Sequence, residues 1–237
     1  MTHSNAILVA AERGVEDRDP RHRLAVVRGL SRLGGEGEAV RGRAVDLLGR
    51  LVADEAEYVR WNVAVALGRL ADPRGLRHLR TLAADEHANV RFRVALAVGL
   101  IGDPDGLDIL IGLREDSYQL GGSFPVPAYV ALALGLLGEP RGLEALTALA
   151  GHSNGEVRWH ATVALGDLSD EQGVEALIAR TEDEISFVRA HAAIALSEVG
   201  SPNGLEAVER LATSDPVDRV RNIAGNALKA LREGLVQ

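Results

Sequence analysis

A short segment repeats along this chain, and this repeat is the feature that most constrains the fold. The small residue that ends each apolar run recurs in steps of 31, 36, 31 and 31 residues, at Gly68, Gly99, Gly135, Gly166 and Ser197. A degenerate copy, HRLAVVRGLSRLG, precedes this series, and RVRNIAGNALKALREGLVQ follows it, so seven copies are detectable. A period of this length is typical of a solenoid, in which each copy buries its apolar face against its neighbours.

The residues of each copy predict two helices. Asp72-Pro73, Asp103-Pro104 and Ser201-Pro202 each place a capping residue before a proline that suits the first helical turn. Gly102 and Gly200 follow apolar runs, where a helix is expected to end. The sequence therefore predicts an all-α fold, a right-handed α-solenoid of about seven helix pairs that spans residues 1–237 as a single domain.

The second helix of each copy carries a regular apolar stripe. With the valine of each Val-Arg pair numbered zero, offsets 0, 4, 7, 8 and 11 lie within an arc of roughly 100° and carry Val, Ala, Leu or Ile. Offsets 5 and 9 are mostly Ala and Gly, which suit a close approach of helices. Offsets 2, 3, 6 and 10, called the groove positions below, point the other way. The stripe predicts the core, and the groove positions predict an exposed face.

The recurring frame VRxxxAxALGxLGDPxGL resembles the short HEAT repeats named after phycobilisome lyases. The resemblance covers nearly the whole chain. It implies that the second helices line a concave face and that the groove positions are the variable contact positions. Because the frame itself is packing chemistry, the resemblance predicts the fold strongly and the function weakly.

Composition restricts the chemistry that is available. The chain has no cysteine, which excludes disulfides, thiol catalysis and thiolate metal sites. Its net charge of −8 opposes a phosphate backbone and argues against a nucleic-acid partner. No apolar run approaches the ~18 residues of a membrane span, and the first residues lack a signal-peptide pattern, so we expect a cytoplasmic protein without membrane contact.

An arginine at offset 1 recurs in six copies and is called the arginine ladder below. In HEAT-like families the corresponding arginine ties neighbouring repeats together, and a guanidinium suits both backbone carbonyls and carboxylates. The fourth copy has Pro127 in this place. The predicted ladder consists of Arg23, Arg60, Arg91, Arg158, Arg189 and Arg221.

Aromatic side chains are concentrated at the groove positions. Trp61, Phe92, Tyr129 and Trp159 are four of only eight aromatic residues in the chain, which favours a binding surface. The alternative is that neighbouring repeats cover these positions, which would make them part of the core. The polar groove positions also change sign along the chain. Arg28, Arg32, Arg69 and Arg93 lie in the earlier copies, whereas Asp167 and Glu198 lie in the later ones, so a bound partner would be oriented.

The step of 36 residues marks an inserted loop at 114–127 in the fourth copy. One interpretation is a tolerated loop, because extra residues between helices cost little. The other is a lid in which Gly121 and Gly122 form a hinge and Tyr118 and Phe124 contact the aromatic groove positions.

Taken together, these features predict a non-enzymatic module that binds a peptide, helix or protein partner. No phosphate-binding loop or catalytic triad spacing is present, and no cofactor is expected. The predicted partner-binding residues are Trp61, Asn62, Arg69, Phe92, Arg93, Tyr118, Phe124, Tyr129, Trp159, His160, Asp167, His191 and Glu198.

Four alternatives follow from the same residues. His160, His191, Asp167 and Glu198 superficially offer a metal site, but seven residues along a helix span ~10.5 Å, too far for ligands to converge. The predicted fold also resembles that of the deoxyhypusine hydroxylases, a HEAT-repeat family that carries iron on adjacent His-Glu pairs, but no His-Glu dipeptide occurs here. By resemblance to the phycobilin lyases, a flat tetrapyrrole could stack on the aromatic residues. A HEAT-like DNA glycosylase is disfavoured, because the grooves of those enzymes are basic, whereas the groove positions of this chain become acidic at Asp167 and Glu198.

Overall fold

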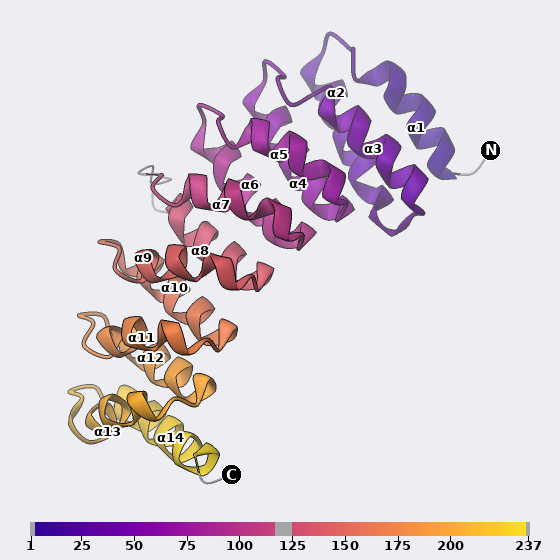
Figure 1. The fold of residues 1–237 in the computed structure, drawn as a ribbon. Helices are drawn as coiled ribbons and strands as arrows, with labels where there is room; N and C mark the ends of the chain where they lie inside the picture. Colours follow the sequence, from indigo (N-terminus) through magenta and orange to yellow (C-terminus); the bar gives the residue numbers. More distant parts are fainter. Residues whose placement is uncertain (1–2, 117–124, 236–237) are drawn as a thin grey trace. The chain divides into compact units, whose positions relative to one another are not determined.

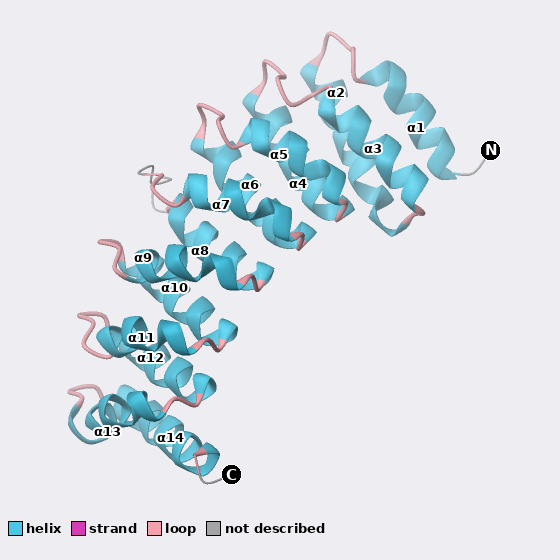
Figure 2. Ribbon diagram, in the orientation of Figure 1, coloured by secondary structure: helices cyan, strands magenta, loops and turns pink. Residues whose placement is uncertain are grey.

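The computed structural model describes residues 3–116 and 125–235, and this part of the chain is entirely helical, with 14 α-helices, six 3-10 helices and no strand (Figure 2). The α-helices occur in succession as seven pairs, which matches the seven copies of the repeat. By their internal contacts the residues divide into two compact units, residues 1–126 (unit 1) and 127–237 (unit 2). Figure 1 shows the successive helices of each unit stacked side by side.

The helix bounds follow the sequence frame. The helices of unit 1 are α1 (His3–Gly14), α2 (Pro20–Leu30), α3 (Glu38–Gly49), α4 (Glu57–Leu70), α5 (Leu76–Leu82), α6 (Ala88–Ile101) and α7 (Leu107–Leu113). The next helix, α8 (Val126–Leu137), begins on the last residue of unit 1 and lies otherwise in unit 2. The remaining helices are α9 (Leu143–Ala150), α10 (Gly155–Leu168), α11 (Val174–Arg180), α12 (Ser186–Val199), α13 (Leu205–Ser214) and α14 (Asp218–Gly234).

Local sequence signals determine where these helices begin and end. The side chains of Asp72, Asp103 and Ser201 each accept a hydrogen bond from the backbone amide two residues later, ahead of a short 3-10 turn that leads into the next α-helix. Gly102 and Gly200 end α6 and α12 in the left-handed conformation, with φ of 68° and 73°. These predicted caps and stops are confirmed.

The core of each unit is the predicted apolar stripe. On α4, Val59, Val63, Ala66, Leu67 and Leu70 occupy offsets 0, 4, 7, 8 and 11, and each is at most 1% exposed. In unit 1 the second helices α2, α4 and α6 pack in a row, and in unit 2 the same holds for α10, α12 and α14. The stripe is thus buried between successive second helices.

Offset 9 is where the helices approach most closely. A Cβ added at Gly68 would lie 2.9 Å from the Cα of Ala97 on the next second helix, and one at Gly166 would lie 2.7 Å from the Cβ of Ala195. Contacts this short leave no room for any side chain, so glycine is required where these helices cross. The predicted role of the small residues is confirmed at these positions.

Candidate binding surface

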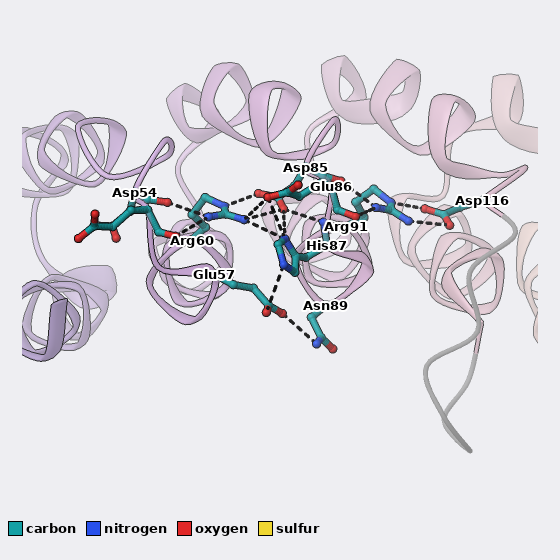
Figure 3. A network of polar contacts seen from close by, with 10 residues as sticks. Asp54, Glu57, Arg60, Asp85, Glu86, His87, Asn89, Arg91 and Asp116 are labelled. Carbon is teal, nitrogen blue, oxygen red and sulfur yellow. Dashed lines mark hydrogen bonds and ion pairs between the residues drawn. The ribbon is translucent and has the colours of Figure 1, made fainter.

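The arginine ladder fixes successive second helices relative to each other. Arg60 on α4 donates two hydrogen bonds to the Asp85 carboxylate, at 2.5 and 3.1 Å, and a third to the backbone carbonyl of Asp54 at 2.8 Å (Figure 3). Asp85 also accepts a hydrogen bond from the His87 amide, where α6 is about to begin. One guanidinium therefore connects the loop before its own helix with the loop before the next second helix.

Burial alone raises the pKa of the Asp85 carboxyl, but the hydrogen bonds from Arg60 and from the His87 amide outweigh it and hold that pKa below its ordinary value. The same balance lowers the pKa of Asp183, the partner of Arg158. Both carboxylates are therefore ionised at neutral pH and act as fixed anchors for their arginines.

The rungs recur with nearly the same geometry. The Arg23–Asp54, Arg158–Asp183 and Arg189–Asp215 pairs are 2.6, 2.6 and 2.7 Å apart, and Arg91 pairs with Asp116 in the same manner. Arg221 differs, because its carboxylate partner is Asp218 on its own helix. Each of these arginines also donates to the carbonyl six residues before it, at Asp17, Asp54, Asp85, His152, Asp183 or Asp215.

The rung that would join the fourth copy to the fifth lacks both of its partners. Pro127 replaces the arginine, and His152 stands in the following loop where the other copies carry the aspartate. The His152 ring takes over the capping role, because its Nδ1 accepts a hydrogen bond from the Asn154 amide at 3.0 Å. Burial, followed by the charge of Arg158, lowers the His152 pKa and favours the neutral ring that this cap requires. No carboxylate is therefore left unpaired at this place.

The groove positions are only partly exposed. At offset 10 the prediction of an exposed face holds, since Leu100 and Leu136 are 59% and 57% exposed. At offset 2 it is wrong for two copies, because Ala128 and Ala190 are buried: they are small enough to be covered completely by neighbouring side chains. Larger side chains at offset 2 are covered only in part by their neighbours. Trp61, Phe92 and Trp159 are half-buried, which gives each ring one packed side and one accessible side.

In unit 1 the aromatic groove positions are joined to a cation. The Arg93 guanidinium lies 4.3 Å from the ring centroids of both Trp61 and Phe92. Contacts of this length are cation–π interactions, which hold the guanidinium against the rings. The Asn62 side-chain amide is turned back to its own helix, where it donates to the Tyr58 carbonyl at 2.6 Å. Arg69, at offset 10, is exposed.

In unit 2 the corresponding rings form a cluster without a guanidinium. The Trp159 ring lies 4.5 Å from the His160 ring on α10, and 5.8 and 5.5 Å edge-on from the rings of Phe187 and His191 on α12. Burial lowers the His160 pKa, so that ring is neutral. The Trp159 Nε1 atom is buried and makes no hydrogen bond to the described residues, so carbon atoms form the exposed part of the ring.

Phe187 is a surface residue that the offset scheme missed. It stands one residue before the Val-Arg frame, is 39% exposed, and its carbonyl accepts a hydrogen bond from His191 Nδ1 at 2.7 Å. Because residues four apart share a helix face, offset −1 lies on the same side as the groove position at offset 3. An aromatic residue at offset −1 was the available signal.

A pocket of about 320 Å³ adjoins this cluster, between the first turns of α12 and α14. Apolar side chains form most of its wall, including Phe187, Val217, Val220 and Ile223, and Arg219 and His191 also line it. Val217 is itself 38% exposed. The first turns of α12 and α14 thus form an accessible apolar recess that continues from the aromatic rings.

Two predicted carboxylates lie near the C-terminal ends of α10 and α12, away from the pocket. Asp167 and Glu198 are exposed and make no ion pair with a described residue. A carboxylate oxygen of Glu198 lies 3.0 Å from where a Cβ on Gly166 would be, so it leans over the neighbouring helix. Burial and then repulsion from Asp167 raise the Glu198 pKa, and His191 offsets this in part.

Some predicted features have no counterpart in the described residues. Tyr118 and Phe124, the predicted hinge and most of the 114–127 loop lie outside them. Tyr129 is half-buried on α8.

No group of three or more potential ligand side chains within residues 3–116 and 125–235 could hold a metal ion. None of the helices formed by these residues is long and apolar enough to cross a bilayer.

Comparison with protein families agrees with the repeated helix pairs. The model for HEAT repeats matches residues 44–120, 121–184 and 148–229, which together span well over half of the chain. The chain belongs to the HEAT-repeat family. No curated protein sequence matches this HEAT-repeat chain.

Several solved structures share its fold. The complex of CpcE and CpcF of phycocyanin lyase from Nostoc sp. PCC7120 is 19% identical, with a TM-score of 0.57 over 99% of this chain and 93% of that chain. Importin beta is 15% identical, with a TM-score of 0.67 over 99% of this chain and 36% of that chain. A computationally designed armadillo repeat protein for modular peptide recognition is 18% identical, with a TM-score of 0.51 over 94% of this chain and 99% of that chain. These likenesses concern the α-solenoid fold.

Proposed function

We propose that this HEAT-repeat protein is a non-enzymatic binding module that holds a peptide, helix or protein segment on its second helices. The observation that carries this proposal is the apolar surface at the groove positions. Leu100 in unit 1, and Leu132 and Leu136 in unit 2, are exposed on the same helix faces that carry the half-buried aromatic rings. Exposed apolar groups gathered on one face mark interaction sites in otherwise polar surfaces.

The kinds of residue at these positions also suit protein recognition. Tryptophan and arginine are the side chains that most often dominate binding energy at protein interfaces, and Trp61, Trp159 and Arg93 are all present. Among the proteins that share the fold, one forms the CpcE–CpcF complex and another is designed for peptide recognition. The fold therefore supplies a suitable scaffold, and the groove positions supply its anchors.

Exposed leucines allow a test that leaves the core intact. Peptides selected from a displayed random library on the intact protein serve as the probe. We expect Leu100→Glu and Leu136→Glu each to weaken capture of the peptides that bind its own unit by tenfold or more, because a carboxylate would replace exposed apolar contact area. The control is Val9→Glu, which changes another exposed apolar residue, 41% exposed, on the first helix α1 and outside the groove positions. Unchanged binding in both leucine variants would refute the proposal.

A second candidate is binding of a flat tetrapyrrole in unit 2. It is supported by the ring cluster of Trp159, Phe187, His160 and His191, since aromatic faces stack on flat ligands and imidazoles bind polar ring substituents. Titration with haem and with a bilin tests it. A spectral shift that Trp159→Ala abolishes would support this candidate, and an unchanged absorption spectrum would dismiss it.

A further inference from the structure

In unit 2, Asp167 and Glu198 differ in their hydrogen bonding from Asp183 and Asp215, the two aspartates that pair with ladder arginines. Asp183 and Asp215 each receive two hydrogen bonds from a ladder arginine. Asp167 and Glu198 receive none from a described residue, although they are close enough for Asp167 to raise the Glu198 pKa. Two neighbouring anions without a counter-ion create a negative potential that a cation would relieve.

The pocket between the N-terminal parts of α12 and α14 favours a different kind of group. Phe187, Val217, Val220 and Ile223 make its wall apolar, and its volume of about 320 Å³ admits a large side chain. Arg219 also lines this pocket, so a second cation is disfavoured there. The two ends of this surface therefore select different groups, an apolar side chain at the pocket and a basic one at the carboxylates.

Helix geometry gives the distance between the two ends. His191 lines the pocket, and Glu198 follows it seven residues later on α12, which is ~10.5 Å along the helix axis. The half-buried Ile194 lies between them on α12, and the Trp159 ring lies against His191 at the pocket end. The same distance corresponds to about three residues of an extended segment or to about seven residues of a helix.

We propose that unit 2 binds a basic protein segment whose apolar side chain enters the pocket beside Phe187 and whose Lys or Arg lies ~10 Å away, over Asp167 and Glu198. This inference rests on the proposed binding function and names the chemistry of the partner. The apolar contact supplies affinity, and the charges fix the direction in which the segment lies.

Synthetic peptides test the direction and the sign of the charge. The probes carry Leu and Lys either three residues apart in an extended sequence or seven apart in a helical one, and each has a counterpart with Glu in place of Lys. We expect the intact protein to bind one Lys peptide at least ~10-fold more tightly than its Glu counterpart. This preference should decrease as the salt concentration is raised. Tighter binding of the Glu peptides would overturn the inference.

Paired variants separate this inference from the proposed function. The double variant Asp167→Asn, Glu198→Gln should lose the preference for Lys over Glu. The control Glu144→Gln, Glu175→Gln should keep it, because it removes the same charge from exposed positions on α9 and α11. Equal preferences in the two variants would overturn the inference while leaving peptide binding itself in place. If selection from the random library yields no peptide that binds the intact protein, the proposed binding function itself is refuted.

A second copy of the chain is the alternative occupant of this surface. Sedimentation of the intact protein and of the Ile223→Arg variant distinguishes the two, because arginine would fill the pocket. Concentration-dependent dimers that this variant abolishes would overturn the proposal. A monomer whose Lys-peptide binding falls ~10-fold or more in Ile223→Arg would support it.

Discussion

The two units of this protein carry the same frame but different surfaces. Trp61 on α4 and Trp159 on α10 both occupy offset 2, and both helices bury the same apolar stripe of Val, Ala and Leu. In unit 1 the neighbouring helix supplies Arg93, whose guanidinium covers the indole ring. In unit 2 it supplies His191 and Phe187, and the carboxylates of Asp167 and Glu198 make no ion pair with a described residue. The comparison teaches that offsets 0, 4, 7 and 8 are constrained by packing, whereas the side chains at offsets 3 and 10 differ in charge between the two units.

The largest expected effect tests whether the frames are equivalent. Arg60→Ala in unit 1 and Arg158→Ala in unit 2 should each lower the free energy of unfolding by about 3 kcal/mol, because each leaves a buried aspartate without its counter-ion. Arg221→Ala should cost under ~1 kcal/mol, since its partner Asp218 is exposed. Urea denaturation measures all three. A cost in one unit that is absent in the other would break the equivalence.

The helix crossings provide the next test. Gly68→Ala and Gly166→Ala should each destabilise the fold by about 1–3 kcal/mol, because the added methyl group would meet the next second helix within 3 Å. Gly225→Ala on α14 is the matched control, since nothing lies within 4 Å of its added Cβ. This variant should gain up to ~1 kcal/mol from helix propensity. Thermal and urea unfolding report the values, and a neutral Gly166→Ala would show that the crossing is looser than described.

A smaller effect sharpens the difference between the two surfaces. In a Trp159→Phe background, where Trp61 is the one remaining tryptophan, Arg93→Gln should shift the tryptophan emission. It should also lower the free energy of unfolding by about 0.5–1 kcal/mol, the size of an exposed cation–π contact. The reciprocal Trp61→Phe background, which reports Trp159, should show no shift. A shift of Trp159 emission caused by Arg93→Gln would contradict the separate character of the two clusters.

The smallest effect concerns pH. The Glu198 pKa is raised in the folded protein, so the folded state binds more protons than the unfolded state as pH rises from the ordinary glutamate value through the folded one. Stability therefore falls across that window, and the loss is complete above it. Glu198→Gln should give a small gain in stability at pH 7 that disappears below ~pH 4. The paired Asp85 and Asp183 behave in the opposite way, because their lowered pKa values stabilise the fold above the unfolded value. A constant difference between variant and parent across this range would contradict the assignment.

Much of this fold could be predicted from the sequence because it is local. Helix caps such as Asp72 and stops such as Gly102 act within a few residues, and the apolar stripe repeats with the helix period. Each copy contacts mainly its neighbours, so one correctly read copy describes the rest. The recurrence of arginine at offset 1 was visible for the same reason.

The parts that could not be predicted depend on three-dimensional packing. Offset 2 is buried for Ala128 and half-exposed for Trp159, because coverage depends on side-chain size and not on helix phase alone. Arg93 was predicted to contact a partner, whereas its position over the Trp61 ring depends on contact between α4 and α6 and could not be predicted. Phe187 lay outside the chosen offsets and enters the surface through its contact with Trp159.

The shared construction of each rung has a consequence for changes in copy number. Every intact rung takes its arginine from one copy and its aspartate from the next, as in Arg60 and Asp85. Removing or duplicating one complete copy within such a series keeps the two kinds of partner in equal number, so no buried charge is stranded. The junction at Pro127 and His152 is an exception that is itself balanced, since both partners are missing together. Such an array can lengthen or shorten by whole repeats, whereas a change that removes a ladder arginine without removing an aspartate leaves a buried carboxylate without its counter-ion.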